Sequence, residues 1–292
     1  LGFQSVVWTQ LGVKIGLWVA YALLTALTGF VSAWLAIRAR PDSADGSTIR
    51  INGDVVEVGK SVSSKTARRV AVVISLIVGV IFGSQFNANW SEILLMFNAQ
   101  SFGTTDPQFG LDNGFYVFML PGLKLVLAAV AMLLGVGLVF SVVTHVLMGG
   151  IRITMPVNGR GLFSITKRCR RQLGIWLMLN MFAWAVRQMI GVFDQLTVQG
   201  SRITGASYTA VHANIPVTFI MAALTAILGV VLGIWLMRSH TLEGQASIGV
   251  RASAALKAWR VPVTSIAVVV VVGLVLTVAW PVLLQRRSEE HT

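Results

Sequence analysis

Six segments of the chain are long and apolar enough to cross a lipid bilayer, which takes about 17–25 residues of α-helix. Apolar residues make up 55% of the 292 residues and charged residues only 12%, whereas a soluble domain is about 25% charged. This composition excludes an ordinary cytosolic enzyme, a disordered chain and a disulfide scaffold. It predicts an all-α polytopic transmembrane helix bundle over residues 1–284, with spans at 15–37, 70–89, 123–147, 173–193, 215–237 and 263–284.

The basic residues alternate between loops, and this alternation predicts the orientation of the chain. Three loops hold 17 of the 23 Lys and Arg residues, and the two loops between them hold only one. Cytoplasmic loops of membrane proteins carry the excess of Lys and Arg. We therefore expect loops 38–69, 148–172 and 238–262 to be cytoplasmic and loops 90–122 and 194–214 to lie outside. The net charge of +12 then indicates contact with anionic lipid at the cytoplasmic face rather than with nucleic acid.

Short-range patterns predict local structure in three of the loops. Asn52-Gly53 stands between two β-prone runs, which predicts a hairpin with a two-residue turn. Apolar residues between Trp90 and Gln100 recur at helical spacing, which predicts an amphipathic helix in the outer headgroup layer. Phe163 and Ile165 stand among the cations of loop 148–172, which predicts an interfacial segment there.

Loop 90–122 is dense in Gly, Pro, Asp and aromatic residues, which predicts an ordered irregular loop because aromatic side chains bury large areas. Its motif comprises Phe97-Asn98, Phe102-Gly103, Asp106-Pro107-Gln108-Phe109-Gly110, Asp112, Phe115-Tyr116-Val117-Phe118 and Leu120-Pro121. A second motif comprises Gly205-Ala206-Ser207-Tyr208-Thr209, Val211-His212-Ala213 and Pro216. Together they resemble the signature of a bacterial membrane family, uncharacterised protein family 0182, which usually has Asp where this chain has Ala210.

The resemblance covers nearly the whole chain and implies an architecture more than an activity, since the family has no agreed activity. Its members continue from the spans into a large extracytoplasmic region. The resemblance also implies a further span ahead of Leu1. We therefore expect this chain to be the membrane part of a bacterial plasma-membrane protein, with residues 285–292 as an outer tail leading to a missing extracytoplasmic region.

The polar residues of the outer loops have two interpretations. Glu92, Asp106, Asp112 and His212 could bind a divalent cation, or the two Asp residues could cap turns in a Gly- and Pro-rich loop. No compact ligand spacing is present, so we favour capping and predict no metal and no cofactor. The residues expected to contact an outer domain or a protein partner are Asp106, Pro107, Asp112, Tyr116, Pro121, Tyr208 and His212.

Arg187 is the one charged residue well inside a predicted span. A charged side chain there costs about 2.5–3.5 kcal/mol on insertion scales and therefore points to function by default. Asp194 follows by two helical turns, so both residues share a helix face. We expect Arg187 to extend outward to Asp194 or to a lipid phosphate, while a substrate or ion path through the bundle is the alternative.

The sequence favours a non-enzymatic role, because the common catalytic and phosphate-binding motifs are missing from it. The leading hypothesis is a membrane scaffold or subunit of a bacterial envelope complex that anchors an extracytoplasmic domain or partner. The alternative is a transporter or channel for a lipid or small solute. A membrane enzyme that uses Asp106, Asp112 and His212 is the third hypothesis.

Overall fold

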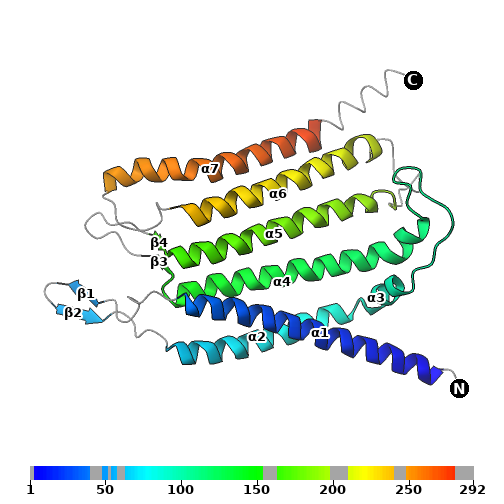
Figure 1. Cartoon of the computed structure of the whole chain (residues 1–292), viewed down its shortest axis with the longest axis horizontal. Helices are drawn as coiled ribbons and strands as arrows, with labels where there is room; N and C mark the ends of the chain where they lie inside the picture. The colour runs from blue at the N-terminus through cyan, green and yellow to red at the C-terminus, as the bar shows by residue number, and fades with distance from the viewer. Residues whose placement is uncertain are drawn as a thin grey trace. The chain divides into compact units, whose positions relative to one another are not determined.

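The computed structural model describes residues 3–39, 48–51, 54–57, 63–153, 163–197, 210–239 and 248–279, which Figure 1 traces in order. The predicted tail 285–292 lies outside these residues. The α-helices are α1 (Phe3–Arg38), α2 (Ser64–Asn87), α3 (Trp90–Phe97), α4 (Leu120–Leu147), α5 (Lys167–Asp194), α6 (Ile215–Arg238) and α7 (Ile248–Leu274). Single π-helical turns adjoin three of them, namely η2 (Phe115–Met119), η3 (Ala210–Asn214) and η5 (Val275–Ala279).

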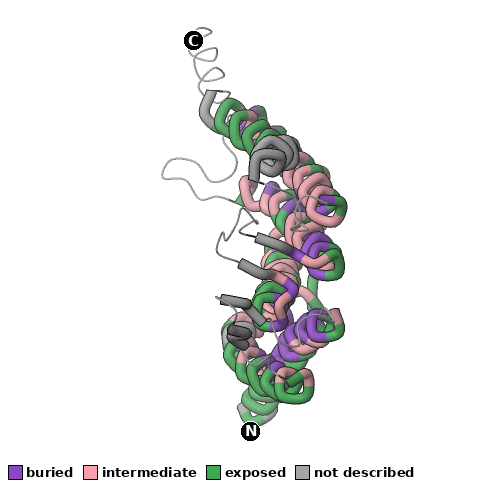
Figure 2. The backbone as a smooth tube through the Cα atoms, turned by 90° about the vertical axis from the view of Figure 1, so that its left-hand side faces the viewer, coloured by how far each residue is buried: buried purple, intermediate pink, exposed green. Residues whose placement is uncertain are grey.

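Six of these helices, all except α3, are long and apolar enough to cross a membrane. Only 11–28% of the residues in their most apolar stretches are buried, and exposed residues extend along the helices in Figure 2. Soluble monomers rarely expose apolar patches larger than a few hundred Å². In lipid, by contrast, a helix makes all its backbone hydrogen bonds within itself, and its exposed apolar side chains contact apolar acyl chains. The predicted all-α polytopic membrane fold with six spans is confirmed.

Two short antiparallel hairpins join the helices. Strands β1 (Thr48–Ile51) and β2 (Asp54–Glu57) pair with Ile51 opposite Asp54, so two residues separate them and the predicted hairpin is confirmed. Strands β3 (Ile151–Ile153) and β4 (Phe163–Ile165) form a second hairpin that the sequence did not predict. Ile165 is buried and packs with Cys169 and Leu173, so its side chain contacts the protein core and not an interfacial lipid layer.

The chain folds as two compact units. The first comprises Leu1–Phe86, Leu133–Leu177 and Leu232–Val261, and the second comprises Asn87–Met132, Met178–Val231 and Pro262–Thr292. In the first unit α1 and α2 approach closely because Gly79 and Gly83 of α2 face α1. A Cβ atom on Gly79 would lie 2.5 Å from the carbonyl oxygen of Ala22, and one on Gly83 would lie 2.9 Å from that of Trp18. These glycines therefore serve packing within the chain.

Polar side chains also join helices inside the first unit. The Nε2 atom of His145 on α4 lies 3.0 Å from Oε1 of Gln172 on α5. The Nε2 atom of Gln172 in turn donates to the carbonyl oxygen of Ser32 on α1, at 2.9 Å. His145 is buried, and its Nε2 atom takes part in this helix-joining network, whereas its buried Nδ1 atom has no hydrogen-bond partner among the described residues.

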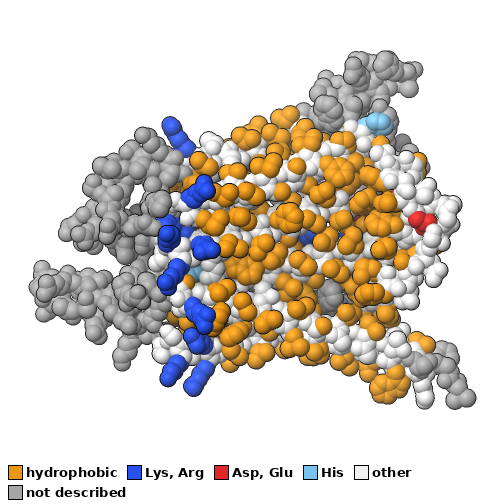
Figure 3. All heavy atoms as spheres, viewed as in Figure 1, with side chains coloured by type: hydrophobic (Ala, Val, Ile, Leu, Met, Phe, Trp, Pro, Cys, Tyr) orange, Lys and Arg blue, Asp and Glu red, His pale blue; other side chains and the backbone are white. Residues whose placement is uncertain are grey.

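Most of the described basic side chains of the first unit gather at one end of its helices, where Figure 3 shows a row of Lys and Arg beside the apolar surface. They lie at the end of α1 and α6 and at the beginning of α2 and α5. This is the pattern expected when successive helices run in opposite directions. The residues are Arg38, Lys65, Arg68, Arg69, Lys167, Arg168, Arg171 and Arg238. Lys14, in the N-terminal half of α1, is an exception.

Candidate functional site

The second unit contains both the first sequence motif and Arg187. Residues 98–114, hereafter the motif loop, connect α3 to η2 and α4. Within the loop the backbone of Asp106 donates to the carbonyl oxygen of Leu111 at 2.9 Å, and that of Asn113 donates to Thr104 at 2.8 Å. Gly110 ends the turn with φ +66°, a left-handed conformation that favours glycine.

Asp112 holds the two ends of the motif loop together. Its Oδ2 atom accepts hydrogen bonds from the Ser101 hydroxyl at 2.5 Å and from the Gly103 amide at 3.0 Å. Its Oδ1 atom accepts from the amides of Phe102 at 3.0 Å and Gly114 at 2.6 Å. The hydrogen bond from Ser101, followed by those from the amides, lowers the pKa of Asp112 to about 2. The carboxylate is therefore ionised at neutral pH.

Asp106 organises the centre of the same loop. Its Oδ1 atom accepts from the amides of Gln108 at 2.7 Å and Phe109 at 2.8 Å. Its Oδ2 atom accepts from the Leu111 amide at 3.1 Å and from the Tyr116 hydroxyl at 2.8 Å. Burial raises the pKa of Asp106, but these hydrogen bonds outweigh it and the pKa lies below its ordinary value.

Both carboxylates therefore cap local backbone amides, as the capping interpretation predicts. Each already accepts four hydrogen bonds, about as many as two carboxylate oxygens can accept. Among the described residues, no three His, Cys, Asp or Glu side chains come together to hold a metal ion. His212 is exposed on η3.

An aromatic cluster attaches the motif loop to α5. Phe193 contacts Phe109 with ring centroids 4.9 Å apart and Phe115 with centroids 5.4 Å apart. Tyr116 lies at 6.4 Å from the same ring, and all three contacts are edge-to-face. Phe193 also lies next to Asp194 in the sequence, so one end of α5 carries both an aromatic and an ionic contact of the second unit. Sequence reasoning missed Phe193.

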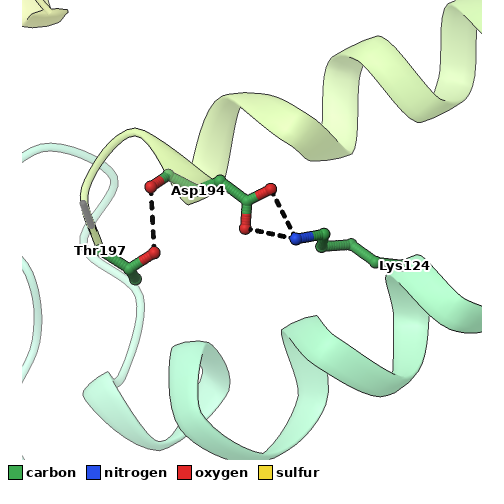
Figure 4. A network of polar contacts seen from close by, with 3 residues as sticks. All are labelled: Lys124, Asp194 and Thr197. Carbon is green, nitrogen blue, oxygen red and sulfur yellow. Dashed lines mark hydrogen bonds and ion pairs between the residues drawn. The ribbon is translucent and has the colours of Figure 1, made fainter. Parts of the chain in front are cut away.

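Asp194 of α5 forms an ion pair with Lys124 of α4 (Figure 4). The Nζ atom of Lys124 lies 2.8 Å from Oδ2 and 2.9 Å from Oδ1 of Asp194. The hydroxyl of Thr197 donates to the backbone carbonyl of Asp194 at 3.0 Å. Asp194 therefore pairs with Lys124 and not with Arg187, which was the partner predicted from the sequence. No role for Lys124 was predicted from the sequence. Lys124 comes from a different helix, 70 residues away in the chain.

Arg187 and the ion pair line one pocket of about 530 Å³ in the second unit. Its lining also includes Pro121 of the first motif and Glu92 of α3. The structure therefore brings Pro121, Arg187 and Asp194 together, and it joins Asp106 to Tyr116. Pro107 lies in the turn of the motif loop. Tyr208 lies outside the described residues.

Neutralising the ion pair between Lys124 and Asp194 is expected to lower the stability of the fold only slightly, because the two side chains are 48% and 37% exposed. In a double-mutant cycle of Lys124→Gln and Asp194→Asn, thermal unfolding in detergent should give a coupling free energy below about 1 kcal/mol. A cycle of Arg187→Gln and Asp194→Asn is the control and should give no coupling. Larger coupling in the control cycle would contradict the pairing.

The comparisons with known proteins identify the family. The chain matches the uncharacterised protein family UPF0182 over residues 1–289. It belongs to UPF0182. A UPF0182 protein of Bifidobacterium longum is 99% identical over 98% of the chain, and one of Bifidobacterium adolescentis is 76% identical over 98%. A UPF0182 protein of Corynebacterium diphtheriae is 29% identical over 98%.

The chain spans only about a quarter of these UPF0182 relatives, namely 27%, 26% and 27% of their lengths. No solved structure matches the chain. The predicted family resemblance is confirmed, and UPF0182 brings no established activity with it.

Proposed function

We propose that this chain is a membrane scaffold of the bacterial plasma membrane that anchors an extracytoplasmic domain or a protein partner through the motif loop. The proposal rests on the hydrogen bonds and aromatic contacts that hold this loop in one conformation. Loops longer than about 12–15 residues without regular structure are usually functional or disordered. Here Asp106 and Asp112 fix the loop through eight hydrogen bonds, and Phe193 fixes it to α5.

The orientation in this proposal follows from the basic loops. Lys and Arg favour the cytoplasmic side, so the end of the first unit that carries them faces the cytoplasm. The motif loop, which follows the second predicted span, then faces outward. Phe97 at the end of α3 and Phe102 in the motif loop are 78% and 51% exposed and offer apolar contacts to a partner.

Photo-crosslinking in cells tests the scaffold. A benzophenone amino acid at Phe102 should crosslink to protein, either to another part of the same polypeptide or to a partner that mass spectrometry identifies. The same amino acid at Val230, which is 47% exposed on the apolar surface of α6, is the matched control and should react with lipid. A Phe102 crosslinking pattern equal to that of Val230 would contradict the proposal.

The pocket at Arg187 supports a second candidate, a transporter or channel for a lipid or small solute. A charged side chain in a pocket among apolar helices is typical of a substrate path. Reconstituted flux that Arg187→Gln abolishes would favour this candidate over the scaffold. Unchanged flux in that variant would remove it.

A further inference from the structure

We propose that the pocket lined by Arg187 binds a glycerophospholipid, with the phosphate at the Arg187 guanidinium and an acyl chain along the apolar lining. The pocket has a polar and an apolar part, as an amphiphile requires. Its volume of about 530 Å³ lies within the range of about 300–1,000 Å³ that is usual for ligand sites.

The apolar part follows the facing sides of two helices. Leu125 and Ala128 contribute from α4, and Trp184 and Ile190 contribute from α5. From Trp184 to Asp194 the pocket extends about 15 Å along α5, at about 1.5 Å per residue. Arg187 lies within this length, about 10 Å from the Asp194 end, so the pocket can hold the headgroup region and the first part of an acyl chain.

The polar part contains one cation, Arg187, that forms no ion pair with the carboxylates of the described residues. Lys124 holds Asp194 through both carboxylate oxygens. Glu92 lines the pocket from α3, yet none of the described carboxylates forms an ion pair with Arg187. The planar guanidinium donates two parallel hydrogen bonds to oxyanions, and two oxygens of a phosphate can accept them.

The depth of Arg187 suits a headgroup phosphate. Helix α5 has 28 residues and is about 42 Å long, so both ends extend beyond a centred hydrocarbon core. Arg187 then lies about 5 Å below the edge of the core, within reach of the phosphate layer for a long side chain. A soluble anion would leave the apolar lining uncovered, which favours a lipid as the ligand.

Native mass spectrometry of the full-length protein with added lipid tests the site. Phosphatidylglycerol should bind, and Arg187→Gln should weaken its binding by about tenfold or more. Arg171→Gln removes the same charge from the other end of α5 and should leave binding unchanged. Diacylglycerol, which lacks the phosphate, should bind the unaltered protein at least about tenfold more weakly.

Three outcomes would overturn the assignment. The first is equal affinity of the unaltered protein and Arg187→Gln for phosphatidylglycerol. The second is equal binding of diacylglycerol and phosphatidylglycerol, a comparison that remains valid if Arg187→Gln does not fold. The third is displacement of the lipid by micromolar inorganic phosphate, which would make the pocket a soluble-anion site. The test does not depend on the scaffold role, since crosslinking at Phe102 measures that role separately.

Discussion

Replacing Asp112 with alanine is expected to open the motif loop to proteases while the six long helices stay folded. The substitution removes the acceptor of four hydrogen bonds, which leaves the amides of Phe102, Gly103 and Gly114 and the Ser101 hydroxyl without that partner. Cleavage of a loop tracks the population of its opened form. Limited proteolysis in detergent should therefore cut residues 98–114 at least about tenfold faster in the variant.

Asn113→Ala is the matched control for this experiment. Asn113 is the next residue, and its side chain donates one hydrogen bond, to the Thr104 hydroxyl at 2.9 Å. Its removal should change the cleavage rate much less. If Asp112→Ala and Asn113→Ala were cut at the same rate, the carboxylate would not be the residue that holds the loop.

The same carboxylate makes the loop sensitive to acid. An unfolded Asp has a pKa of about 3.9, and the pKa of Asp112 in the folded loop is about 2. Because the folded pKa is depressed, its stabilisation is complete above about pH 4 and is lost as the pH falls to about 2. Cleavage by an acid protease should rise across this window, and Asp112→Ala should show a smaller rise. The remaining rise is attributable to Asp106, whose pKa is also lowered.

The parts of this fold that were predictable from sequence are those encoded by neighbouring residues. Apolar runs long enough for a bilayer predict the six long helices, because in lipid a helix is the local solution for the backbone. The Asn-Gly pair at 52–53 predicts the first hairpin, because few other dipeptides adopt its turn. The second hairpin lacked such a signal, since residues 154–162 separate its strands.

Contacts between distant segments were not predictable, because they depend on which helices become neighbours. The spacing of Arg187 and Asp194 on one helix face predicted a contact between them. Lys124, on α4, reaches Asp194 instead, and nothing local to the sequence indicates that α4 and α5 face each other there. Phe193 was missed for the same reason, since its ring partners come from the motif loop and from η2.

The capping roles of Asp106 and Asp112 were predictable in part, because most of their hydrogen-bond partners lie within the same loop but one does not. Their amide partners are two to ten residues away, so a loop rich in Gly and Asp indicates that the carboxylates bind local backbone. The hydrogen bond from Tyr116 to Asp106 is different. It ties the loop to the beginning of the next helical segment, and sequence spacing alone gave Tyr116 only an expected role in an outer contact.

Gly79→Leu is expected to prevent the close packing of α1 against α2. The new Cβ atom would lie 2.5 Å from the carbonyl oxygen of Ala22 and 3.1 Å from the Cβ atom of Ala26. The first of these is a backbone atom inside a helix, so it cannot rotate away. Overpacking of this kind costs about 1–3 kcal/mol or more. Thermal denaturation in detergent should show a large loss of stability, and expression of folded protein should fall.

Gly12→Leu separates this packing effect from a general effect of leucine. Gly12 lies on α1 and also belongs to a Gly-x-x-x-Gly pair, but a Cβ atom there would meet nothing within 4 Å. Glycine is about 0.8–1.0 kcal/mol less favourable in a helix than alanine, and leucine ranks just below alanine, so this variant should be as stable as the natural protein or slightly more so. Equal stability of Gly79→Leu and the natural protein would contradict the α1–α2 packing. A loss of stability in Gly12→Leu would instead show that another segment or a second copy covers the glycine pair on α1.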